Sequence, residues 1–257
     1  MSGFDIPAIR VTTEKGFVMK NYAGTTYISH DAKPQLMDLL RSMGRSIMTV
    51  PALTNVAAPI AGHPDIQMCR MGVPEPAGCA GAVEEALPAK HWTDAPLFVP
   101  APEELAQLTE KYPSDVAFCA ACTGKYFLHN LKFTHPRLLS VAEQMGMRMI
   151  HVRQGYAKCS TVIVDRDSII TYDRGIAAPA EAAGMSVLLI RPGHIHLPGY
   201  DTGFIGGASG RVDDAVIFNG NLMGHPDGAA IRDFVLSRGL RCLWLEQFSL
   251  SDIGSIL

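Results

Sequence analysis

The stretch that decides the fold is GYAKCSTVIVDRDSIITYDRGIAAPAEAAG, residues 155–184. Its β-branched runs alternate with a turn and an alanine-rich segment, which predicts the order strand, turn, strand, helix, strand. We expect the hairpin strands at 160–164 and 169–172, the helix at 177–183 and the third strand at 185–190. Gly184 ends the helix, because glycine readily adopts the left-handed conformation that follows a last helical turn.

Similar combinations of strand and helix recur along the rest of the chain, and Gly44, Gly146 and Gly239 again end the helices. The expected strands are 25–29, 47–50, 116–122, 126–130, 147–152, 215–218 and 240–245, and the expected helices are 33–43, 103–112, 136–145 and 229–238. Each unit is too small to bury its own apolar face, so the units must pack against one another.

The expected fold class is α/β, a single domain of five ββαβ-like modules over residues 1–257. The modules lie at about 22–50, 51–115, 116–153, 154–191 and 211–257, and the lead-in before them has no assigned element. The second module is enlarged by a passage rich in Pro, Ala and Gly at 72–102, which is either a lid or a surface excursion. An ordinary doubly wound α/β sheet is the alternative, since it also alternates strand and helix.

Composition restricts the classes of partner. The net charge is -3, from 22 basic and 25 acidic residues, without a block of like charge, which disfavours nucleic acid. No apolar run approaches the roughly 20 residues of a membrane-spanning helix, and the first residues do not resemble a signal peptide. Six cysteines in a chain of 257 residues predict reduced thiols in a cytoplasmic protein. A small-molecule substrate is expected, and a homo-oligomer stays open.

A closed ring of five such modules resembles the pentein fold, the five-bladed α/β propeller of the guanidine-modifying enzymes. The chain from about residue 154 to 257 also resembles an uncharacterised family assigned to that fold. This second resemblance lies in the segments QGYAKCS, LPGY, GFIGG, GHPD and DIGS, which occur here in that order.

The resemblance implies chemistry for two segments. Gly62-His63-Pro64-Asp65 resembles the Gly-His-x-Asp segment of deiminases, whose His is the general acid/base and whose Asp holds the guanidinium. Cys159, followed by small hydroxyl residues, resembles the nucleophile of the same superfamily. His63 lies in module two and Cys159 in module four, which is also the module spacing of those enzymes. The implied activity is a cysteine-dependent hydrolase or transferase acting on a small guanidine or amidine compound.

The residue types suit that chemistry. A guanidinium carbon is a poor electrophile, whereas a thiolate is a strong nucleophile once its pKa falls from about 8.5. Lys158 and a protonated His63 are expected to lower the pKa of Cys159. The planar cation needs carboxylates for forked hydrogen bonds, and these are Asp65 and Asp201. The further substrate-binding candidates are Asn55, Ser160, Gly206 and Gly207. No cofactor is expected.

Other features favour a non-catalytic propeller that serves as a binding or assembly protein. The better-known enzymes carry the nucleophile in the last module after a Gly-Gly loop, but here Gly206-Gly207 is followed by Ala208-Ser209-Gly210. The GHPD segment also returns at 224–227, where Asp227 is expected to cap the following helix.

Two segments contain residues with the spacing of metal ligands. Cys119 and Cys122 have metal-ligand spacing, but on a strand their sulfurs point to opposite faces. His194 and His196 could hold zinc together with His63 or Asp201, and metal hydrolysis is therefore a third hypothesis.

The end of the sequence, at 251–255, is expected to complete the sheet of the first module. Such an addition would close a ring and bring Asp252 toward the axis.

Overall fold

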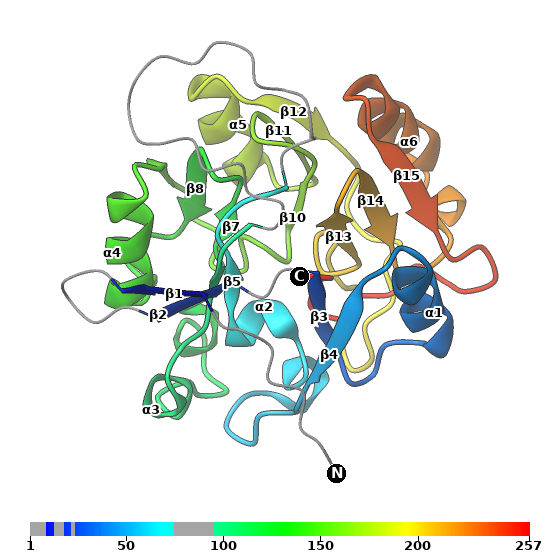
Figure 1. The fold of residues 1–257 in the computed structure, drawn as a ribbon. Coiled ribbons are helices and arrows are strands. Elements are labelled where there is room, and N and C mark those ends of the chain that lie inside the picture. Colours follow the sequence, from blue (N-terminus) through cyan, green and yellow to red (C-terminus); the bar gives the residue numbers. More distant parts are fainter. Residues whose placement is uncertain (1–8, 13–17, 22–23, 75–94) are drawn as a thin grey trace.

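The computed structural model describes residues 9–12, 18–21, 24–74 and 95–257 (Figure 1). The described chain has five small sheets, joined by short helices, so the predicted α/β class is confirmed. Figure 1 shows the sheets around the C-terminal end of the chain, which lies near the centre of the view. No helix in these described ranges has the length and apolar composition needed to cross a bilayer.

Three sheets share one plan. The first strand pairs antiparallel with the second, and a helix then leads to a third strand that pairs parallel with the second. The elements are β7 (Ala121–Cys122), β8 (Tyr126–His129), α4 (Pro136–Gln144) and β9 (Arg148–His151); β10 (Thr161–Ile163), β11 (Ser168–Thr171), α5 (Arg174–Ala182) and β12 (Ser186–Leu189); and β13 (Ser209–Val212), β14 (Ala215–Phe218), α6 (Gly228–Ser237) and β15 (Arg241–Trp244). In these three sheets the expected ββαβ order is present.

The first module has the helix and the parallel pair, and the C-terminal segment adds to it. β3 (Thr25–Ser29) and β4 (Ser46–Val50) pair in parallel through α1 (Pro34–Ser42). The Leu257 N–H donates to the Tyr27 carbonyl at 2.9 Å, and the Tyr27 N–H donates to the Leu257 carbonyl at 2.5 Å. Ile256 N–H donates in turn to the Ser209 carbonyl of β13 at 3.0 Å. The segment 251–257, here named the tail, therefore links the first sheet to the last one.

The remaining sheet departs from the plan. Its strands are β1 (Ile9–Thr12), β2 (Val18–Asn21), β6 (Leu97–Phe98) and β5 (Cys69–Arg70), in this spatial order, and all its pairs are antiparallel. Two of its strands come from the lead-in that had no assigned element. A short 3-10 helix, η1 (Ala58–Ile60), and α2 (Pro64–Gln67) precede β5. Most of the passage 72–102, which was expected to be either a lid or a surface excursion, lies outside the described residues.

Two predicted elements are shorter than expected. The helix predicted at 103–112 is only α3 (Pro102–Leu105), because the Asn55 side-chain amide donates to the carbonyls of Leu105 and Leu108, which a longer helix would use. The strand predicted at 116–122 is reduced to β7 and is preceded by a 3-10 helix, η2 (Ser114–Val116). The Cys119 carbonyl accepts from the Lys158 N–H, which belongs to the next module, instead of from a ladder partner.

The strand β13 was not predicted because it contains Gly210, and glycine has a low β-propensity. The glycine has a packing reason, since a Cβ on Gly210 would lie 2.0 Å from the Ile256 carbonyl oxygen. The helix-ending glycines, by contrast, behave as predicted: Gly44, Gly146, Gly184 and Gly239 all have positive φ.

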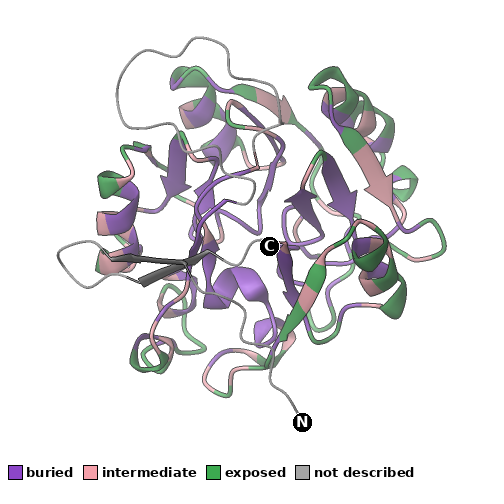
Figure 2. Ribbon diagram, in the orientation of Figure 1, coloured by how far each residue is buried: buried purple, intermediate pink, exposed green. Residues whose placement is uncertain are grey.

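Burial decreases from the inside of each three-stranded sheet to its outside (Figure 2). The middle strands β8, β11 and β14 are buried throughout, whereas β9, β12 and β15 are partly exposed. Each helix covers its sheet with one apolar face, as Leu36 and Leu40 do in α1. The inner strand ends and the loops before them therefore face the interior of the molecule.

Because the tail links two sheets, we expect its buried side chains to contribute to the free energy of unfolding. Ile256 is 1% exposed and belongs to the apolar cluster that includes Leu36 of α1 and Ile217 of β14. Ile256→Ala should lower the free energy of unfolding by about 2–5 kcal/mol in urea titrations. The matched control Leu236→Ala, at a site that is 51% exposed, should change it by about 0.5 kcal/mol or less. Equal effects of the two substitutions would mean that the tail is not part of the core.

Candidate functional site

Four segments that are far apart in the sequence meet at one point of the interior. They are the start of α2, the turn before β10, the loop at 203–208 and the tail. His63 lies at the N-cap position of α2, with Pro64 as the first helical residue. Proline has a fixed φ that suits this position, so the GHPD segment starts the helix and directs the residues on either side of the proline.

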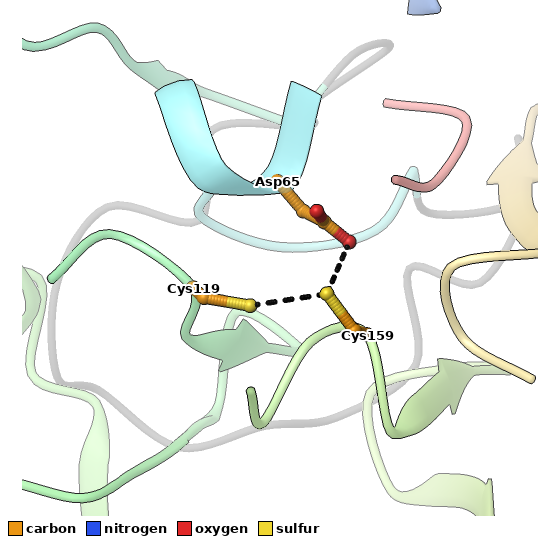
Figure 3. A group of neighbouring side chains, drawn as sticks. All are labelled: Asp65, Cys119 and Cys159. Atoms are coloured by element: carbon orange, nitrogen blue, oxygen red, sulfur yellow. Dashed lines mark hydrogen bonds between the residues drawn. The ribbon is translucent and has the colours of Figure 1, made fainter. Parts of the chain in front are cut away.

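Cys159 and Asp65 are in direct contact. The Cys159 thiol donates a hydrogen bond to Asp65 Oδ2 at 3.1 Å, and the Cys119 sulfur lies 3.5 Å from the Cys159 sulfur (Figure 3). All three side chains are buried, with at most 2% exposed. The fold thus joins residues from α2, from the segment before β7 and from the turn before β10.

Asp65 is held by a buried chain of hydrogen bonds from the tail. Ser255 Oγ donates to Asp65 Oδ2 at 2.6 Å, and Lys158 Nζ donates to Ser255 Oγ at 2.8 Å and to the Gly206 carbonyl at 3.2 Å. Ser255 has a φ of 77°, a left-handed conformation that is uncommon for a residue with a side chain. The other oxygen, Asp65 Oδ1, is buried and has no hydrogen-bond partner among the described residues.

His63 faces a second carboxylate, Asp252. The distance from His63 Nδ1 to Asp252 Oδ1 is 3.8 Å, which is longer than a hydrogen bond, and Nδ1 has no other partner in the described chain. Asp252 is fixed by the backbone, since its two oxygens accept from the N–H groups of Gly254 and Phe204, each at 2.9 Å. The geometry therefore orients the Asp252 carboxylate toward His63 Nδ1, which makes no hydrogen bond among the described residues.

Cys159, His63 and Asp252 line one small pocket of about 80 Å³. Its other walls are mainly apolar or aromatic, and the complete set of lining residues is Ile60, His63, Ile66, Tyr156, Cys159, Leu197, Tyr200, Thr202, Phe204 and Asp252. Drug-sized ligands occupy pockets of roughly 300–1,000 Å³, so this one suits a small head group. Asp65 is not among the lining residues and contacts the thiol from behind.

The electrostatics of the pocket oppose a thiolate. Burial raises the pKa of the Cys159 thiol well above its ordinary value, and the hydrogen bond with Cys119 and the charges of Asp65 and Asp252 raise it further. The net shift of this pKa is therefore upward, opposite to the shift that Lys158 and His63 were expected to produce. Burial also raises the pKa of Asp252, although the nearby His63 opposes that shift.

The remaining substrate-binding candidates have structural contacts. Asp201 is exposed and does not line the pocket, and Asn55 binds the end of α3. Ser160 Oγ lies 3.3 Å from the Tyr172 hydroxyl. Gly206 and Gly207 allow close backbone approach, because a Cβ on Gly207 would lie 2.1 Å from Asp252 Oδ1.

The two sulfurs of the Cys119-Ala-Ala-Cys122 segment diverge, as predicted. Cys119 contacts Cys159, whereas the Cys122 sulfur lies 3.6 Å from that of Cys69. Within the ranges that the structure describes, the histidines of the 194–196 segment do not form a three-ligand group with His63 or Asp201. The hypothesis of metal hydrolysis through these histidines consequently has no geometric support.

The second GHPD segment has a different role from the first. Asp227 occupies the N-cap position of α6, as predicted, but its side chain does not cap the helix. Its carboxylate instead pairs with the Arg191 guanidinium, the shortest contact being 2.7 Å.

Three residues of the site were not assigned by sequence reasoning. Asp252 was expected near the axis but was given no chemistry, and Cys119 and Ser255 were given no role at the thiol. The segments QGYAKCS and DIGS were both singled out in the sequence, and the structure brings them into contact through Lys158 and Ser255.

Residues 27–257 match a family of unknown function (DUF6873). The chain belongs to this family. No curated protein and no solved structure matches it. The DUF6873 region includes every residue of the site, from His63 to Ser255, and also includes both partners of the Tyr27–Leu257 pairing.

Two glycines of the DUF6873 region allow a test of how closely the tail packs on His63. Gly254 and Gly44 have φ values of 71° and 81°, but a Cβ on Gly254 would lie 2.1 Å from His63 Cβ, whereas one on Gly44 would meet nothing within 4 Å. Both alanine substitutions should strain the backbone by about 1–3 kcal/mol. Gly254→Ala should lower the free energy of unfolding by a further amount of at least about 1 kcal/mol, because it also overpacks the interior. Equal losses in urea titrations would contradict this packing.

A second prediction concerns the charge behind the thiol. Asp65→Asn removes a negative charge that raises the pKa of Cys159, so this pKa should fall and the thiolate fraction at neutral pH should rise. Alkylation of Cys159 by neutral iodoacetamide should accelerate by up to about tenfold for each unit of that fall. Mass spectrometry of Cys159 between pH 6 and pH 10 measures the shift.

The control for this experiment is Asp38→Asn, at an exposed carboxylate of α1. It should leave the pH profile of Cys159 unchanged. An unchanged profile in Asp65→Asn as well would show that Asp65 does not act on the thiol.

Proposed function

We propose that the five sheets form a five-bladed propeller of the pentein type. The ββαβ plan of three sheets supports this arrangement, and so does the tail, which adds a strand-like partner to β3 and bonds to β13. In such a ring His63 belongs to the second module and Cys159 to the fourth.

We infer that the protein is a cysteine-dependent hydrolase or transferase of a small guanidine or amidine compound. The observation that carries this inference is the shared pocket, in which a thiol, an imidazole and a carboxylate come together from three distant segments. Nucleophile, acid/base and orienting carboxylate are the parts that covalent catalysis needs.

The charge of the pocket favours a cationic substrate. Asp252 lines the pocket and Asp65 lies directly behind the thiol, whereas none of the described lining residues is Lys or Arg. A guanidinium or amidinium group is planar and can bind carboxylates through forked hydrogen bonds. Its positive charge would also offset the carboxylates that raise the pKa of Cys159, so the substrate itself would favour the thiolate.

The proposed first step is attack of the Cys159 sulfur on the central carbon of the bound cation, with the thiol proton passing to His63. A C–S bond forms and the C=N π electrons move to nitrogen, which gives a tetrahedral intermediate. His63 then protonates the departing amine as the C–N bond breaks, leaving the carbon attached to sulfur. Asp252 faces His63 Nδ1 and would hold the ring in the required orientation, with the contact shortening when substrate binds.

The second step releases the product and separates the two activities. In a hydrolase His63 removes a proton from water, the oxygen attacks the carbon, and the C–S bond breaks as His63 returns that proton to the sulfur, which regenerates the thiol. In a transferase an acceptor amine takes the place of water. The apolar walls of the pocket, such as Ile60 and Leu197, limit the solvent that competes for this step.

A non-catalytic binding protein is the second candidate. The specific observation in its favour is that burial raises the pKa of the Cys159 thiol well above its ordinary value, while the thiol donates a hydrogen bond to Asp65. In that case Asp252 would bind a small cation in the pocket and the sulfur would only pack against it. In either role we propose a cytoplasmic protein whose partner is a small molecule and not nucleic acid.

Two alkylating reagents of similar size but different charge test the catalytic proposal. Chloroacetamidine is a cation at pH 7 and chloroacetamide is neutral. The ratio of their rates at Cys159 should exceed the ratio at the half-buried Cys242 by at least about tenfold, because the carboxylates attract the amidinium. Peptide mass spectrometry gives both rates from one sample.

The control variants separate the pocket carboxylate from a surface carboxylate. Asp252→Asn should lower the ratio at Cys159, whereas Asp201→Asn, at an exposed residue outside the pocket, should not. Equal ratios at all accessible thiols would refute the proposal. Stabilisation by small guanidines without any selective labelling of Cys159 would favour the binding protein.

A further inference from the structure

The proposed reaction leaves one neighbouring thiol without a role. Cys119 is fully buried, does not line the pocket and lies 3.5 Å from the sulfur of Cys159. Together with Asp65 these two cysteines form a compact group of soft and anionic donors (Figure 3). Within the described ranges of the chain, no other group of three such side chains comes together in this way.

We propose that Asp65, Cys119 and Cys159 form a binding site for a thiophilic divalent cation, with Zn²⁺ as the occupant. Thiolate sulfur selects soft or borderline metals, and zinc accepts mixed sulfur and carboxylate ligands. Binding would replace the two thiol protons, which pass to solvent, with two zinc–sulfur bonds.

The distances in the group fit a tetrahedral ion after small movements. The three donor atoms lie within 4.8 Å of one another, with 3.5 Å between the sulfurs and 3.1 Å from the Cys159 sulfur to Asp65 Oδ2. Zinc–sulfur bonds of about 2.3 Å and zinc–oxygen bonds of about 2.0 Å separate tetrahedral ligands by roughly 3.5–3.8 Å. For these two separations, shifts of a few tenths of an ångström would therefore suffice.

The surroundings supply the second requirement, an oriented carboxylate. Ser255 Oγ donates to Asp65 Oδ2, while Asp65 Oδ1 is buried without a partner among the described residues and is free to bind a cation. Two thiolates, one carboxylate and Zn²⁺ carry a net charge of -1. The buried Lys158 ammonium, linked through Ser255, balances that charge.

The pocket gives the ion a route to the site, and the ion would compete with a substrate for the Cys159 sulfur. Cys159 lines the pocket, so an ion can reach the group from that side. An occupied site would hold the Cys159 sulfur as a metal ligand and remove it from attack. This metal site does not depend on the proposed reaction, because it requires only the three donors.

Cobalt binding to the full-length, chelator-treated protein tests the site without any substrate. Co²⁺ is a spectroscopic substitute for Zn²⁺, and its thiolate complexes absorb in the near ultraviolet. The native protein should bind one equivalent with this absorption, and Zn²⁺ should abolish it by displacement. Cys119→Ser, Cys119→Ala and Asp65→Asn should each weaken Co²⁺ binding by at least about tenfold.

The matched controls are Cys122→Ser, from the other close pair of thiols, and Cys242→Ser. Both should bind Co²⁺ as the native protein does. Unchanged binding by the Cys119 variants, or loss of binding in Cys122→Ser, would overturn the site.

A second measurement uses the native protein and does not depend on how the variants fold. Zn²⁺ should protect Cys119 and Cys159 from alkylation under partly denaturing conditions, and Cys69 and Cys122 should remain unprotected. Protection of Cys69 and Cys122 instead would contradict the assignment. If the cysteine-dependent reaction is wrong but the metal site is right, cobalt still binds while chloroacetamidine shows no preference for Cys159.

Discussion

The backbone pairing of Leu257 with Tyr27 is the constraint on which the rest of the structure depends. It fixes the tail between β3 and β13, and the tail then makes three contacts within the site. Asp252 faces His63, the Gly254 carbonyl accepts from the Asp65 N–H at 3.1 Å, and Ser255 binds the Asp65 side chain. The segment that links the first sheet to the last one is therefore also the segment that orients both carboxylates around Cys159.

Such a close approach requires backbone without side chains, and this explains the glycines of the 203–207 loop. Gly206 packs against the carbonyls of the turn that carries Cys159, and Gly207 packs against Asp252. Ser255 shows the opposite requirement. It keeps a left-handed backbone although it has a side chain, because its hydroxyl connects Lys158 to Asp65. Backbone strain at this point is consistent with a functional demand on the hydroxyl.

Sequence periodicity was sufficient for most of the strands and helices and for the glycines that end them, because these features depend on local patterns. The resemblance to the guanidine-modifying enzymes, and not the periodicity, selected His63, Asp65 and Cys159, which the fold brings into one neighbourhood. Neither the local pattern nor the resemblance could assign Cys119, whose contact with Cys159 depends on how two modules pack, and neither showed where the Lys158 ammonium binds. The ammonium binds Ser255, and the pKa of the thiol is set by burial and by carboxylates that come from distant segments. Tertiary electrostatics of this kind have no signature in local sequence.

Each of the two cations considered above is assigned a buried carboxylate, Asp252 in the pocket for the organic cation and Asp65 behind the thiol for the metal. That account requires the tail to stay in place, whereas the last residues of a chain usually fray. Native-state hydrogen exchange of the Leu257 and Tyr27 amides tests this requirement most directly. We predict that both amides exchange as slowly as those of the buried strand β14. Exchange of the Leu257 amide at the rate of an unstructured peptide would contradict the account.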